Sequence, residues 1–179
     1  MPLALRDAEA RQLCEHLPDV VAGVLRPRVV CAYLPVGAEP GSEAMVERLR
    51  ELCDEVLLPV ARIDDSGGHL PLQWGRYVPG TLVAARFGLQ EPPPPWLPPD
   101  EVTRAAVVLV PALAVDRSGV RLGRGGGFYD RSLALCGPQT RLVAVVRDCE
   151  VVDDLPSEPH DVRMTHVLTP AAGLVRLRE

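Results

Sequence analysis

The sequence predicts a single α/β domain in which helices cover both faces of a mostly parallel β-sheet. Three observations support this fold class. The chain has 179 residues, the size of one ordinary domain. Several short segments are apolar at almost every position, as expected of strands that are buried on both faces. Segments with helical spacing of apolar residues separate these strands. No internal repeat or domain boundary is visible, so residues 1–179 are expected to form one domain.

The first third of the chain predicts two helices and two strands. Residues 3–17 have apolar side chains among polar ones, as in an amphipathic helix. The apolar, β-rich segment 29–36 predicts a buried strand. Ser42 is a suitable N-cap for a helix in which apolar residues recur over 45–53. Residues 55–61 then predict a second strand.

The rest of the chain contains a long irregular part before its most apolar segment. Residues 62–104 are irregular, with a possible short strand near 70–74 and a rigid proline loop at 92–95. Residues 105–115 form the most apolar segment and predict a central strand. The remaining expected elements are a helix over about 129–136 and strands over 141–146 and 166–168.

Composition excludes several classes of function. The net charge of −5 disfavours bulk attraction to nucleic acid or to anionic membranes. No apolar run reaches the roughly 18 residues of a membrane helix, and the N-terminus lacks a secretory pattern, so a cytoplasmic protein is expected. The five cysteines include no Cys-x-x-Cys pair, so buried free thiols are expected. All nineteen basic residues are arginine, and any phosphate contact from a basic side chain must come from arginine.

One glycine-rich segment, Arg121-Leu-Gly-Arg-Gly-Gly-Gly-Phe-Tyr-Asp130, has the composition of a phosphate-binding loop. Its four glycines let several backbone N–H groups approach a phosphate, and they adopt positive φ angles at little cost. A helix is expected directly afterwards, which adds donors. Arg121 and Arg124 could each hold phosphate oxygens with two hydrogen bonds. Asp130 is well placed to bind Mg²⁺.

Two familiar nucleotide-binding loops do not fit this segment. A P-loop ends in Gly-Lys-Ser/Thr, and this chain has no lysine. A dinucleotide fingerprint needs Gly-x-Gly-x-x-Gly directly between strand and helix, whereas the glycines here have another spacing and follow an intervening segment, 116–122. A plain glycine turn in a hairpin remains the alternative.

The segment resembles the 5-formyltetrahydrofolate cyclo-ligase (methenyltetrahydrofolate synthetase) family. The family signature is Pro-x-Leu-Ala-Phe-Asp, a short gap, and Gly-x-Arg-Leu-Gly-x-Gly-Gly-Gly-Tyr-Tyr-Asp-Arg. This chain has Pro111-Ala-Leu-Ala-Val-Asp116 and Gly119-Val-Arg-Leu-Gly-Arg-Gly-Gly-Gly-Phe-Tyr-Asp-Arg131. The resemblance extends over about residues 28–170. The weaker matches are Tyr33–Glu39, Leu57–Val60, Phe87–Pro92, Leu155–Asp161 and Val167–Thr169.

The resemblance implies conversion of 5-formyltetrahydrofolate to 5,10-methenyltetrahydrofolate, with ATP and Mg²⁺ as cofactors and release of ADP and phosphate. It implies that Arg124 and Tyr129 are catalytic, that Glu39 anchors the folate, and that Asp130 and Asp161 bind the metal. The residues implied to contact ATP are Arg6, Arg121, Leu122, Gly123, Arg124, Gly125, Gly126, Gly127, Phe128 and Tyr129. Those implied to face the folate as well are Arg124, Gly125, Gly126, Gly127 and Phe128.

The chain departs from the family pattern at two places. Phe128 stands where the family usually has a tyrosine. Family members generally begin with a basic helix that helps to bind ATP, and the only basic residues in the helix expected here are Arg6 and Arg11. Weak ATP binding is therefore expected.

Two of these residues also have a purely structural interpretation. Asp161 could cap a turn, and Glu39 could be a solvated turn residue. Two other functions remain open for the whole chain. These are a non-catalytic relative that binds folate or nucleotide, and a phosphosugar-binding protein on a similar sheet. A monomer without nucleic-acid or membrane partners is expected.

Overall fold

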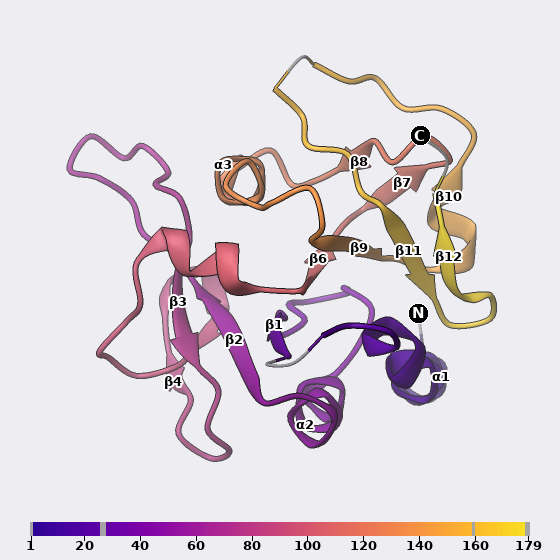
Figure 1. Ribbon diagram of the computed structural model, residues 1–179, viewed down its shortest axis with the longest axis horizontal. Coiled ribbons are helices and arrows are strands. Elements are labelled where there is room, and N and C mark those ends of the chain that lie inside the picture. The colour runs from indigo at the N-terminus through magenta and orange to yellow at the C-terminus, as the bar shows by residue number, and fades with distance from the viewer. Residues whose placement is uncertain (1, 26–27, 159, 178–179) are drawn as a thin grey trace.

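The computed structural model describes residues 2–25, 28–158 and 160–177, and its central feature is a seven-stranded sheet (Figure 1). The strand order is β12-β11-β9-β6-β1-β2-β3. Strands β1, β2, β6, β9 and β11 run parallel, while β3 and β12 pair antiparallel at the two edges. The mostly parallel sheet predicted from the sequence is confirmed. The strands are β1 (Val29–Cys31), β2 (Glu55–Val60), β3 (Gln73–Arg76), β6 (Val107–Pro111), β9 (Arg141–Val145), β11 (His166–Thr169) and β12 (Gly173–Arg176).

Helices cover both faces of this sheet, as predicted. Helices α1 (Leu3–Val21) and α2 (Glu43–Leu52) lie side by side on one face (Figure 1). On the other face lie α3 (Phe128–Leu133) and the 3₁₀ helix η2 (Pro99–Arg104). None of the helices in the described ranges is both long and apolar enough to cross a membrane.

Strand β6 shows why the central strands are apolar at every position. Val107 and Leu109 pack into the core under α1 and α2, whereas Val108 and Val110 pack into the core under α3 and η2. All four side chains are fully buried. Because successive side chains point to opposite faces of a sheet, a strand that is covered on both faces needs no polar position.

Two small sheets complete the fold. In the first, β7 (Ala114–Asp116) pairs antiparallel with β8 (Arg121–Leu122) and parallel with β10 (Val151–Val152). In the second, β4 (Val83–Ala84) pairs with β5 (Gln90–Glu91). The short 3₁₀ helices η1 (Arg86–Gly88) and η3 (Asp148–Glu150) lie in connections. The hairpin of β7 and β8 leads directly into the glycine-rich segment, whose first two residues form β8.

The buried carboxylate of Asp116 holds this hairpin. Its Oδ1 accepts hydrogen bonds from the Ser118 N–H and hydroxyl, both at 2.8 Å, and from the Val120 N–H at 3.0 Å. Its Oδ2 accepts a hydrogen bond from the Leu155 N–H at 3.1 Å. Burial alone would raise the pKa of Asp116, but these hydrogen bonds outweigh it and lower the pKa. The last residue of the Pro111–Asp116 motif therefore has a structural role.

Several element boundaries differ from those predicted. The strand expected over 29–36 ends at Cys31, because the following residues leave the sheet to form a loop at its edge. The strand expected over 105–115 is divided into β6 and β7, which lie in different sheets. After Pro111 the chain turns, and the Leu113 N–H donates to the Leu122 carbonyl of β8.

The other differences are at element ends and edges. Helix α1 continues past residue 17, because Val20 and Val21 are also buried against the sheet. Helix α3 is shorter than the expected 129–136, and β3 lies C-terminal to the expected 70–74. Edge strand β12 was not predicted. All five cysteines are free thiols, as expected, although only Cys31 is fully buried.

Candidate functional site

Arg6, Glu39 and the glycine-rich segment gather at the carboxyl edge of the parallel strands. This edge is where open α/β sheets commonly bind ligands, because the loops that follow parallel strands meet there. The loop 32–39 follows β1, His69 lies in the connection that follows β2, and Arg147 follows β9. Each of these segments contacts either the glycine-rich segment or the loop that ends at Glu39.

Glu39 is held in place. Its side chain is 12% exposed, and its Oε2 accepts a hydrogen bond from the Val36 N–H at 2.8 Å. Its Oε1 lies 3.2 Å from Nη2 of Arg124. Gly37 makes the tight turn between Val36 and Glu39 possible, because its φ of +64° is costly for other residues. These contacts argue against a freely solvated turn residue and bring the proposed folate anchor to the glycine-rich segment.

Three arginines from distant parts of the chain donate to three consecutive carbonyls of this loop. Arg124 donates to the Val36 carbonyl at 3.2 Å. Arg6, from α1, donates to the Gly37 carbonyl. Arg147 donates to the Ala38 carbonyl at 2.9 Å. The structure thus places Arg6 on the loop that ends at Glu39, while its implied contact with ATP stays a prediction. It adds Arg147, which sequence reasoning missed.

Arg147 links this loop to two acidic residues. It lies 2.9 Å from Glu9 of α1 and 3.2 Å from Glu150 of η3, and it is only 15% exposed. Burial alone would lower the pKa of Arg147, but these two carboxylates raise it above its usual value, so the guanidinium remains charged. Its position directly after a buried strand, at the carboxyl edge, is the sequence signal that could have identified it.

The glycine-rich segment has the backbone geometry that its sequence predicts. Gly125 and Gly127 have φ angles of +81° and +64°, which L-residues with side chains rarely adopt. Gly127 precedes α3 and is its N-cap. The loop therefore depends on glycine at these two positions.

Arg121 and Asp130 form an ion pair across this segment. Nη2 of Arg121 lies 2.8 Å from Oδ1 of Asp130, and the Arg121 side chain is only 6% exposed. Among the described residues, its buried Nε–H has no hydrogen-bond partner. A buried donor without a partner costs free energy, so an oxyanion that accepted this hydrogen bond would be stabilised. This unsatisfied donor fits a phosphate group at the site.

Tyr129 lies beside the same arginine. The Arg121 guanidinium carbon is 5.8 Å from the centre of the Tyr129 ring. Burial, and then the negative charge of Glu39, raises the pKa of Tyr129 well above its usual value, although Arg121 opposes this shift. The phenol therefore keeps its proton at neutral pH and can act as a hydrogen-bond donor.

Asp161 lies in the connection between β10 and β11. Its Oδ2 accepts a hydrogen bond from the Glu158 N–H at 2.7 Å, so it does cap a turn. Within the ranges that the structure describes, no three or more His, Cys, Asp or Glu side chains form a group that could hold a metal ion. Mg²⁺ that arrives with a nucleotide needs only one or two carboxylates besides phosphate oxygens and water. The metal-binding roles of Asp130 and Asp161 stay predictions.

His69 is a second residue that sequence reasoning missed. Its Nδ1 lies 2.5 Å from the carbonyl oxygen of Gly126, 57 residues later in the chain. Its ring stacks on Phe128, with ring centres 4.2 Å apart and an angle of 17° between the planes. His69 lies in the irregular part of the sequence, where no local pattern indicated this contact.

Arg11 lies away from these residues. It lines a cavity of about 700 Å³ between α1 and α2. Charged side chains of both signs line the same cavity: Asp7, Glu15, Glu47, Arg48 and Glu51. Of the two basic residues in the first helix, the structure therefore places only Arg6 at the site.

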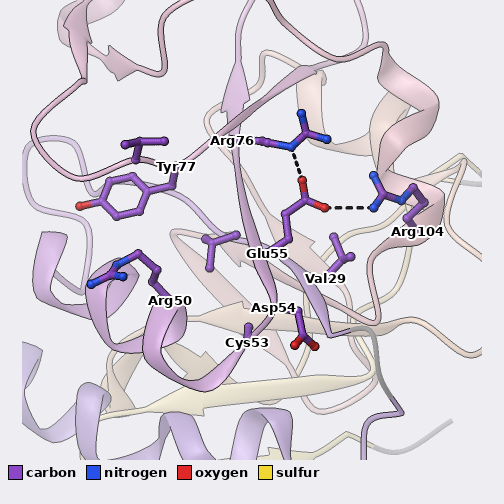
Figure 2. Close-up of a pocket in the computed structure, with 10 residues that line it drawn as sticks. Val29, Arg50, Cys53, Asp54, Glu55, Arg76, Tyr77 and Arg104 are labelled. Atoms are coloured by element: carbon purple, nitrogen blue, oxygen red, sulfur yellow. Dashed lines mark hydrogen bonds and ion pairs between the residues drawn. The ribbon is translucent and has the colours of Figure 1, made fainter.

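A second cavity, of about 360 Å³, lies at the opposite, amino edge of the parallel strands (Figure 2). Glu55, the first residue of β2, bridges Arg76 and Arg104 at 2.5 Å and 3.0 Å. Arg104 also pairs with Glu101 at 2.5 Å. These arginines are thus already neutralised, and the cavity contains none of the residues that gather at the carboxyl edge.

Replacing Glu55 with glutamine is expected to lower stability without changing any activity of the carboxyl edge. The variant loses two partly exposed ion pairs, which are worth about 1 kcal/mol together. Thermal unfolding and turnover should be measured on the same preparation. A large loss of turnover would move the functional site to this cavity.

Comparison with known proteins agrees with the sequence resemblance. A sequence model of the 5-formyltetrahydrofolate cyclo-ligase family matches residues 4–170. The chain is 59% identical over 179 residues to a 5-formyltetrahydrofolate cyclo-ligase of Mycolicibacterium smegmatis, which covers 99% of this chain and 90% of the relative. It is 32% identical over 149 residues to the 5-formyltetrahydrofolate cyclo-ligase of Escherichia coli, covering 83% of this chain and 81% of that relative.

Solved structures with the same fold include two 5,10-methenyltetrahydrofolate synthetases. The one from Aquifex aeolicus superposes with a TM-score of 0.68 at 24% identity, over 95% of this chain and 84% of the other. The one from Mycoplasma pneumoniae gives a TM-score of 0.67 at 15% identity, over 93% of this chain and 88% of the other. At these identities the likeness concerns the fold alone.

Proposed function

Because the chain belongs to the 5-formyltetrahydrofolate cyclo-ligase family and is an enzyme of that class, we propose that it converts 5-formyltetrahydrofolate to 5,10-methenyltetrahydrofolate with ATP and Mg²⁺, releasing ADP and phosphate. The observation that carries this proposal is the pairing of Arg124 with Glu39 at 3.2 Å. It joins the glycine-rich segment, proposed to bind ATP, to the loop proposed to bind folate. Phosphoryl transfer requires its two reactants to be held together in this way.

The chemistry explains why both sites are needed. The oxygen of a formamide is a poor leaving group. ATP supplies a phosphoryl group to this oxygen, and the neighbouring folate nitrogen then attacks the formyl carbon and closes the ring. The carbon–oxygen bond breaks, and the oxygen leaves as part of inorganic phosphate.

The residues of the glycine-rich segment are proposed to position the phosphates. The backbone N–H groups of Gly123 to Gly127 would donate to phosphate oxygens, as in other glycine-rich loops. Arg121 would contribute its buried Nε–H, which has no partner among the residues that the structure describes. Arg124, whose side chain is 55% exposed, would place its guanidinium against the charge that develops during transfer. Tyr129, which stays protonated, would donate a further hydrogen bond.

Three acidic residues have other roles. Glu39 would accept hydrogen bonds from folate ring nitrogens. Its Oε2 already accepts from the Val36 N–H, and this contact fixes the loop that presents the carboxylate. Asp130 and Asp161 would hold Mg²⁺ together with phosphate oxygens, and the ion would neutralise phosphate charge. Asp130 would then exchange part of its pairing with Arg121 for the ion.

The direct test follows the appearance of methenyltetrahydrofolate by its absorbance, with 5-formyltetrahydrofolate, ATP and Mg²⁺ present. We expect product to form only when all three are added. Binding of ATP or folate without turnover would instead favour a non-catalytic relative. Binding of a sugar phosphate in preference to ATP would favour a phosphosugar protein.

Replacing Glu39 with glutamine is expected to weaken folate far more than ATP. A hydrogen bond to a charged group contributes about 1.5–3 kcal/mol, so folate affinity should fall about 10- to 100-fold. Glutamine keeps one oxygen that can accept from the Val36 N–H, so the loop should remain folded. Calorimetry with each ligand provides the measurement.

A matched control is Glu51→Gln on α2, where the carboxylate is 57% exposed and pairs with Arg48. It should bind both ligands like the parent protein. Equal folate affinity in the parent and in Glu39→Gln would remove Glu39 from the folate site.

A further inference from the structure

His69 reaches the glycine-rich segment from the connection between β2 and β3. A carbonyl oxygen can only accept a hydrogen bond, so the contact at 2.5 Å from Gly126 requires the hydrogen to be on Nδ1 of His69. The same ring stacks on Phe128, at a distance typical of a favourable aromatic pair. His69 thus contacts the segment on both sides of Gly127.

The segment that carries His69 is fixed in its own right. His69 itself pairs with Ile63 across a short antiparallel bridge. Between them, the Asp64 carboxylate accepts hydrogen bonds from Ser66 and from the Gly68 N–H, at 2.6 Å to 2.9 Å. Farther along, the Leu72 N–H donates to the Ser132 hydroxyl of α3 at 2.9 Å. His69 is therefore presented by a rigid turn that is anchored on α3.

The contact determines how one peptide group of the loop is turned. In a planar trans peptide, the C=O of one residue and the N–H of the next point in opposite directions. A Gly126 carbonyl held toward His69 therefore orients the Gly127 N–H away from His69. Within the described chain this N–H has no acceptor, and glycine would otherwise let the peptide rotate freely.

We propose that His69 is a positioning residue for the glycine-rich segment: its Nδ1–H fixes the peptide between Gly126 and Gly127 so that the Gly127 N–H is available to a nucleotide phosphate. The inference rests on the proposed function, because it assumes that the segment binds ATP. His69 acts through the backbone and touches no phosphate itself. Arg131, whose Nη1 lies 3.3 Å from the same carbonyl, assists more weakly.

Two substitutions of His69 separate the hydrogen bond from the stacking. Asparagine places an N–H donor at the same distance along the side chain as Nδ1, but it has no aromatic ring. Phenylalanine keeps a ring that can stack on Phe128, but it has no donor. Leu70→Asn is the control, since Leu70 is the exposed neighbour in the same segment.

The experiment measures the KM for ATP, the KM for 5-formyltetrahydrofolate, ATP·Mg²⁺ affinity by calorimetry, and the Tm of each variant. We expect His69→Phe to raise the KM and the Kd for ATP about 10-fold, and His69→Asn to stay within about 3-fold of the parent protein. For Tm we expect the reverse order, with His69→Asn below His69→Phe, because stability depends on the ring that stacks on Phe128. The KM for folate should change less than that for ATP, and Leu70→Asn should resemble the parent.

Two results would overturn the inference. One is an ATP affinity in His69→Phe equal to that of the parent. The other is an ATP affinity that falls in step with the Tm across the variants, which would show that His69 only packs. The parent protein distinguishes this failure from failure of the proposed function: a parent that binds ATP but forms no methenyltetrahydrofolate refutes the function alone, and one that binds no ATP refutes both.

Gly126→Ala tests the same contact from the other side. Its φ is not in the left-handed region, but an added Cβ would lie 3.3 Å from Nδ1 of His69 and 3.2 Å from the Phe128 ring. We expect this crowding to raise the KM for ATP as His69→Phe does. The double variant should then cost little more than either single one, because both remove the same contact. Fully additive effects would contradict the inference.

Discussion

Replacing Arg124 with alanine is expected to lower turnover by about 100-fold or more, the usual cost of removing a donor that stabilises charge in a transition state. Arg124 lies between Gly123 and Gly125, and it is the residue that joins the two proposed substrate sites. Its side chain is 55% exposed, and its contacts to Glu39 and to the Val36 carbonyl, both at 3.2 Å, are long. Stability should therefore change little, and the loss should appear mainly in kcat.

Two further variants make this result specific. Arg117→Ala removes an arginine that is 72% exposed and pairs with an exposed aspartate, and it should behave like the parent protein. Arg124→Lys keeps the charge but loses the planar set of donors, so it should recover only part of the activity. Steady-state kinetics of folded Arg124→Ala that match the parent would exclude a catalytic role.

Replacing Asp130 with asparagine is expected to raise the Mg²⁺ concentration needed for half-maximal activity about 10-fold, because an amide oxygen is a weaker ligand than a carboxylate. The structure adds a second expected effect. The Arg121 guanidinium is nearly buried and would lose its anionic partner, so unfolding free energy should fall by about 1–3 kcal/mol.

Separate measurements resolve these two effects. The Mg²⁺ requirement comes from turnover titrations, and stability from thermal unfolding without ligand. Asp161→Asn is the matched comparison, since Asp161 is proposed to bind the ion without pairing to Arg121. An Asp130→Asn variant that is destabilised but has the parent's Mg²⁺ titration would make Asp130 a purely structural partner of Arg121.

The fold could be predicted from the sequence because its signals are local. Continuous apolar segments separated by helical spacing indicate strands covered on both faces, and this was sufficient for a mostly parallel sheet. The division of the expected strand 105–115 could not be predicted, since Leu113 is as apolar as its neighbours. What ends β6 is the pairing of Leu113 with Leu122, a contact that depends on the later hairpin.

The site shows the same limit. The glycine-rich segment and Glu39 could be identified because they lie in recognisable motifs. Arg147 had only the general signal of its position directly after a buried strand, and His69 had none. Each acts through a backbone carbonyl far away in the sequence, and any donor could fill that role. The ion pair of Arg121 with Asp130 was also missed, since its members had each been assigned to a ligand and only the structure shows them together.

The central claim is that ATP phosphorylates the formyl oxygen at this site, and isotope tracing tests it most directly. 5-Formyltetrahydrofolate labelled with oxygen-18 in the formyl group is converted with unlabelled ATP, Mg²⁺ and the enzyme, and the released phosphate is analysed by mass spectrometry. The account predicts one labelled oxygen in each phosphate, in step with methenyltetrahydrofolate formed. Unlabelled phosphate, with the label in water, would show that ATP hydrolysis and ring closure are separate events and would contradict the account.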